Sequence, residues 1–149
     1  MSNSPLFTSS LLDVPRPFVD AVSSATEALG IAGLVFERPR RDCTIVLVLD
    51  AMRRGIHLNR FAPLSLHTVH EIIADCSDLP SPTGLVIISS RSSSHSPHQD
   101  RELLNLSHTM LHNAGLELLE WIVTGPGEIY CPGIWASTSG PWSITSSRT

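Results

Sequence analysis

Two histidines and an aspartate follow a strand-like apolar run in the stretch VIISSRSSSHSPHQD at positions 86–100. His95, His98 and Asp100 have the spacing His-x-x-His-x-Asp, and imidazole nitrogens with a carboxylate are ligands that Zn²⁺ accepts. Three such ligands leave a fourth position open for a water, which the metal activates for hydrolysis. A zinc-dependent hydrolase is therefore one hypothesis for this chain.

The same stretch also has the form of a helix start. Ser96 is suited to the N-cap, Pro97 to the first helical position, and Gln99 to the third position of a capping box. This start places His98 and Asp100 in the first turn, where residues two positions apart point about 200° away from each other. The zinc site is therefore the alternative, and a polar, well-capped helix start is the main interpretation.

The surrounding hydrophobic pattern predicts the elements that hold this stretch. Periodic apolar residues predict helices that begin at Pro17, near Leu66 and at Pro97, with Gly30 and Gly115 as caps of the first and last. CTIVLVLDAMRRGIHLNRFAP predicts two strands joined by a turn, and GLVIIS, LELLEWIVTG and EIYCP predict one strand each. The order predicts an α/β (α+β) domain, in which a mixed sheet is flanked by about three helices.

The length and composition of the chain fit a single domain, and its motifs limit the kinds of functional site that we expect. The chain has 149 residues, of which 42% are hydrophobic, and we expect a flexible arm at 1–15, a domain at 16–135 and a Ser/Thr-rich tail at 136–149. The three cysteines form no CxxC pair, so reduced thiols are expected. Neither a signal peptide nor a long apolar run is present, which predicts a cytoplasmic protein without a membrane partner. No nucleotide-binding glycine motif or GxSxG is present.

Charge gives no general reason to expect nucleic acid as a partner, because the net charge is -4. All ten cations are arginines, and six lie close together in the sequence: Arg38, Arg40, Arg41, Arg53, Arg54 and Arg60. A solvated hairpin flank is the main interpretation of this cluster, and association with DNA is an alternative.

Several segments, taken in order, resemble the RadC-like branch of the JAB/MPN (JAMM) domain family, as a divergent bacterial member. RDCTIVLVLDAMRR resembles the first core strand and its turn, and LHTVHEIIADC the helix that follows in that family. GLVIIS resembles the strand before the metal-binding loop, and SPHQDRELLNLSHTMLHNAGLELLEWIVTG the next helix and strand. The resemblance covers residues 40–132.

The resemblance implies a degenerate metal site. In the active family two loop histidines and an aspartate hold Zn²⁺, and a glutamate on the first strand activates the water. The glutamate position falls on Asp42, the histidine positions on Ser89 and Arg91, and the aspartate on Asp100. Serine is a poor zinc ligand and a guanidinium has no lone pair to give, so the resemblance implies no cofactor. It places a cation where the metal would lie, which could neutralise Asp100 or Asp42, and it leaves open which side chain Arg91 contacts.

The leading hypothesis is therefore a non-catalytic protein-binding or scaffolding domain, not an enzyme, with an unknown protein partner. The hairpin at 45–60 has an exposed strand edge that could pair with a second copy of the chain, so a homodimer is also an alternative. The competing hypothesis is an isopeptidase-like or metallopeptidase-like zinc hydrolase with rearranged ligands, which would use Asp42, His95, His98 and Asp100. The Arg38 to Arg60 cluster carries the third hypothesis, association with DNA.

Overall fold

The computed structural model describes residues 15–35, 41–93, 96–125 and 128–130. Helices and strands follow one another in the predicted order, which confirms the mixed α/β class. Their bounds are α2 Ala25–Ala32, β1 Cys43–Leu49, β2 Gly55–Phe61, α3 Leu66–Cys76, β3 Gly84–Ser90, α4 Pro97–Asn113, β4 Glu117–Gly125 and β5 Glu128–Tyr130.

The strands form one mixed sheet in the order β2-β1-β3-β4-β5. β1 runs antiparallel to both β2 and β3, while β3 and β4 are parallel and are connected through α4. Every residue of β1 and β3 is buried, as expected for central strands with both faces covered. The uninterrupted apolar run of β1 thus predicted its central place correctly.

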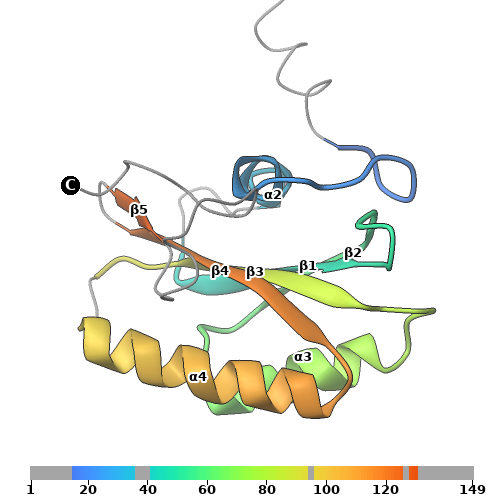
Figure 1. Ribbon diagram of the computed structural model, residues 1–149. Helices are drawn as coiled ribbons and strands as arrows, with labels where there is room; N and C mark the ends of the chain where they lie inside the picture. Colours follow the sequence, from blue (N-terminus) through green and yellow to red (C-terminus); the bar gives the residue numbers. More distant parts are fainter. Residues whose placement is uncertain (1–14, 36–40, 94–95, 126–127, 131–149) are drawn as a thin grey trace, which may run out of the picture.

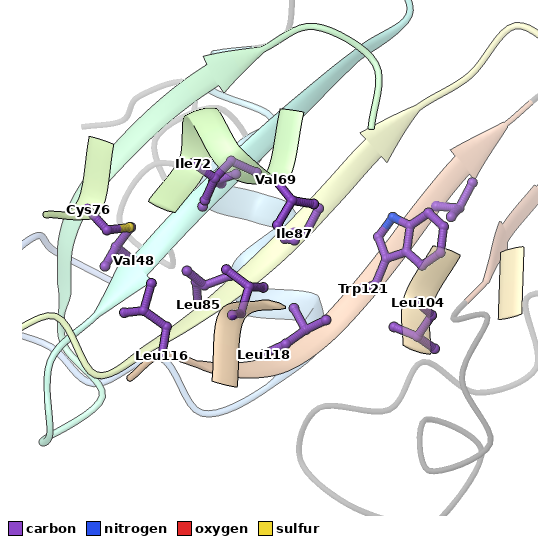
Figure 2. Close-up of a cluster of buried hydrophobic side chains, with 13 residues drawn as sticks. Val48, Val69, Ile72, Cys76, Leu85, Ile87, Leu104, Leu116, Leu118 and Trp121 are labelled. Atoms are coloured by element: carbon purple, nitrogen blue, oxygen red, sulfur yellow. The ribbon is translucent and has the colours of Figure 1, made fainter. Parts of the chain in front are cut away.

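Two apolar layers hold the sheet between its helices. α3 and α4 cover one face, and α2 lies on the other (Figure 1). The layer below α3 and α4 is the larger one, and Figure 2 shows how its side chains gather from both helices and from β1, β3 and β4. The opposite layer joins α2 to the other faces of β1 and β3. Among the described residues, no helix has both the length and the apolar character needed to cross a bilayer.

The first helix begins later than its amphipathic pattern predicted. We expected it to run from Pro17 to a cap at Gly30, but α2 begins after Ser24, whose hydroxyl accepts a hydrogen bond from Glu27 N, and continues past Gly30. The residues before it pair with the β1–β2 hairpin instead: Phe18 N donates to Gly55 O at 2.8 Å, and Val22 N to Arg53 O at 2.7 Å. An extended segment buries Val22 as well as a helix would, so spacing alone misplaced the boundary.

The start of α4 agrees with its sequence signals. Ser96 accepts from Gln99 N, the Gln99 side chain accepts from Ser96 N, and Pro97 lies at the beginning of the helix. After the helix, Gly115 has a φ of 82°, a left-handed conformation that glycine adopts without strain. The capping box fixes the first turn, and with it the position of Asp100.

Candidate functional site

The fold gathers the four positions of the predicted degenerate site at one end of the sheet. Because β1 and β3 are antiparallel, with Cys43 opposite Ser90, the residue before β1 lies beside the end of β3. Arg91 directly follows β3. Its backbone N–H donates to Thr124 O of β4 at 2.9 Å, so the pairing of the two strands continues by one residue. The chain then turns into α4, whose first turn carries Asp100.

Asp100 lies on the buried face of α4 rather than on the solvent side. The buried residues of this helix are Asp100, Leu104, Ser107 and Leu111, a spacing of four, three and four that places all of them on one face. His98, two positions before Asp100, is exposed. The geometry of the first turn thus separates these two side chains, as the helix start predicted.

Arg91 forms a buried ion pair with Asp100. Arg91 Nη1 lies 2.9 Å from Asp100 Oδ1 and donates a hydrogen bond to Oδ2 at 3.1 Å. The side chains are only 7% and 3% exposed, so little water screens the two charges. Of the two carboxylates that Arg91 could neutralise, the one on the helix makes this contact.

Trp121 of β4 links this ion pair to Ser89. The guanidinium carbon of Arg91 lies 5.3 Å from the centre of the Trp121 ring system, which is a cation–π distance. On the other side, Trp121 Nε1 donates to Ser89 Oγ at 2.8 Å. Figure 2 shows Trp121 within the layer covered by α3 and α4.

Sequence reasoning did not identify this hydrogen bond of Trp121. A buried indole N–H needs an acceptor, and that requirement was the signal that could have led to Ser89. The resulting network runs from Ser89 through Trp121 and Arg91 to Asp100.

Asp42 has a different role at the rim of the site. Its side chain is exposed, and Oδ1 accepts a hydrogen bond from Ser92 N at 2.9 Å. This contact fastens the residues after β3 to the start of β1. A polar hollow of about 240 Å³ opens here, lined among others by Arg41, Asp42, Arg91 and Thr124.

The residues at these positions do not fit a catalytic zinc ion. Ser89 is buried and already accepts the indole N–H, and the Arg91 cation faces the carboxylate that a metal would need. Among the described residues, no three His, Cys, Asp or Glu side chains gather as metal ligands do. His95 lies outside the described residues, so the alternative set of His95, His98 and Asp100 stays a prediction.

The arginine cluster divides between the two ends of the β1–β2 hairpin. At the turn, Arg53 lies 3.9 Å from Glu117 and Arg54 lies 3.0 Å from Asp50. Hydrogen bonds from the Arg54 backbone, among other contacts, hold the pKa of the Asp50 carboxyl below its usual value.

Arg60 lies near the far end of β2, where its Nη1 donates to Val35 O at 2.8 Å. A strand of this length separates the two groups by about 20 Å. Arg38 and Arg40 lie outside the described residues. Arg53 and Arg54 therefore lie apart from Arg60, and association with DNA stays a prediction.

Comparison with known proteins adds no family assignment: neither the protein-family models nor the curated proteins include a match to this chain. The resemblance to the JAB/MPN family therefore rests on the sequence segments given above.

Proposed function

We propose that this chain is a non-catalytic, JAB/MPN-like protein-binding or scaffolding domain in which an internal ion pair stands at the position of a lost zinc ion. The observation that carries the proposal is the buried contact of Arg91 with Asp100. An arginine in a protein stays protonated and supplies no lone pair, so it neutralises Asp100 without activating a water.

The remaining groups at this end of the sheet support a structural role. Ser89 serves as acceptor for Trp121, and Asp42 as acceptor for the Ser92 backbone. A hydrolytic site needs a base within reach of a water or nucleophile, and an oriented group for the developing charge. The hydrogen bonds described here hold the fold together instead.

The outer edge of the sheet supports a role in protein binding. β2 is one of the two edge strands of the sheet and is largely half-exposed. Its first residues are covered by the segment around Ala21, which forms a bridge with Arg54. An edge strand offers backbone groups to an extended partner chain, including a second copy of the same domain. A protein partner that adds to β2 is therefore the form of binding we favour.

Zinc analysis tests the loss of the metal site. We expect purified protein to retain no stoichiometric Zn²⁺, and added Zn²⁺ or a chelator to leave its melting temperature unchanged, because a ligand shifts stability only by binding the folded state. His98→Ala is the decisive variant, since His98 is exposed and its loss should not disturb folding. Bound zinc in the natural protein that disappears in His98→Ala would overturn the proposal and favour the hydrolase.

A further inference from the structure

An apolar cavity of about 280 Å³ lies far from the ion pair, between the segment at 15–18, the end of α2 and the β1–β2 hairpin. In Figure 1 the segment is the blue loop on the same side of the sheet as α2. The apolar side chains that line it are Phe18, Val22, Ile31, Leu34, Leu47 and Leu58. Its size is near the lower end of the range of about 300–1,000 Å³ that is typical of small-molecule sites.

The outer wall of the cavity is held in a fixed and unusual conformation. Phe18 has a φ of 65°, a left-handed conformation that is rare for an aromatic residue. Hydrogen bonds from Phe18 N to Gly55 O and from Val22 N to Arg53 O hold this segment on the hairpin. The Phe18 side chain is 63% exposed and Leu34 is 57% exposed. Large apolar groups thus surround the opening, and no side chain of the described residues fills the space between them.

The ionisable side chains on the cavity wall contact carboxylates of the chain itself. Among its described lining residues, two have ionisable side chains, Arg16 and His57. Arg16 donates to Asp20 from Nε at 2.9 Å and from Nη2 at 3.2 Å, and His57 Nε2 lies 2.8 Å from Asp75 Oδ2. A charged ligand would lose its hydration here without gaining a free counter-charge, whereas an apolar ligand would lose little.

We propose that this cavity binds a small, neutral, largely apolar molecule, such as a medium-length aliphatic alcohol or a compound with one aromatic ring. The apolar wall supplies the binding free energy through burial of ligand surface. The inference is independent of the zinc question, because the cavity lies across the sheet from Trp121 and α4.

Titration with three probes of the same chain length tests the proposal. 1-Octanol, octanoate and octylammonium are added to the full chain, and backbone amide shifts are followed by NMR. We expect saturable shifts with octanol at Ile31, Leu34 and Leu58, and weaker binding of both ions by about tenfold or more. No saturable octanol binding, or octanoate binding as tight as that of octanol, would overturn the proposal.

Filling the cavity provides the matched test. Leu58→Trp and Leu34→Trp place an indole in the cavity, and Leu34 is exposed enough for its replacement to leave the fold intact. Leu106→Trp adds the same group to an exposed leucine of α4 as the control. We expect the filling variants to weaken octanol binding by about tenfold or more and the control to retain it. Equal octanol affinity in all three folded variants would contradict the assigned site.

Discussion

Removing Arg91 should destabilise the protein more than removal of any exposed arginine. Arg91→Ala leaves the Asp100 carboxylate, which is only 3% exposed, without the guanidinium that faces it. Breaking a buried pair in this way costs about 3–5 kcal/mol, against a total stability of about 5–15 kcal/mol for a typical domain. For a chain of this size the loss corresponds to a fall in melting temperature of roughly 6–20 °C.

The contact between Arg91 and Trp121 gives the Arg91→Ala substitution a second effect on stability. Arg91→Ala also removes the cation from the indole face, where it lies 5.3 Å from the ring centre. Arg91→Met retains much of the packing against Trp121 but lacks the charge. We therefore expect Arg91→Met to be destabilised by less than Arg91→Ala, and the difference measures the packing contribution of the long side chain.

Replacing both partners should restore most of the loss. Arg91→Met combined with Asp100→Leu removes both charges of the pair, and such replacements are often neutral, or stabilising by about 1–4 kcal/mol. Urea unfolding of the single and double variants closes a double-mutant cycle, provided that the m-value stays constant. Arg16→Ala is the control, because its ion pair with Asp20 is exposed and should contribute no measurable stability. If Arg91→Ala unfolds at the same urea concentration as Arg16→Ala, the reasoning from burial is refuted.

Other changes test the layers around the site. Thr44 is fully buried and its hydroxyl has no hydrogen-bond partner among the described residues, so Thr44→Val should raise the free energy of unfolding by about 1 kcal/mol in urea titrations. Ser96→Ala should lower it by about 0.5–2 kcal/mol because the hydroxyl that accepts from Gln99 N is lost, whereas Ser96→Thr should retain most of the stability. Burial, with a smaller effect of Asp75, raises the pKa of the Cys76 thiol from 9.0 to about 11. The folded state therefore holds this proton more tightly than the unfolded state, and its contribution to stability is complete below pH 9.0 and is lost as pH rises toward 11. Mass spectrometry should find Cys76 resistant to iodoacetamide at pH 8 in folded protein and reactive in urea.

The sequence predicted the elements well where one physical requirement dominated. An unbroken apolar run such as Thr44 to Leu49 fits a central strand, and the capping residues Ser96 and Gln99 define a helix start. The prediction failed at α2, where Phe18 and Val22 have helical spacing but belong to a segment bonded to the hairpin. A contact with a distant hairpin leaves no periodic signal in the local sequence.

The site was predictable only in part for the same reason. The helix start placed Asp100 in the first turn, and the resemblance made it one of two carboxylates that Arg91 could neutralise. The hydrogen bond from Trp121 to Ser89 joins residues 32 positions apart and depends on the parallel register of β3 and β4. The predicted strand LELLEWIVTG contains Trp121, but only the register shows that its N–H meets a serine on the neighbouring strand.

The proposed exchange of a zinc ion for Arg91 changes how this end of the sheet is stabilised. A metal ion can dissociate, so a domain that depends on it loses stability when a chelator is present. The guanidinium is attached to the chain and stays charged at all physiological pH values, so the neutralising charge is always present beside Asp100. The single positive charge of Arg91 faces the Asp100 carboxylate, whereas Asp42 is exposed to water. Under this proposal the site keeps the shape of a hydrolase and loses its chemistry, and the structure that remains is suited to holding a binding surface in place without a metal.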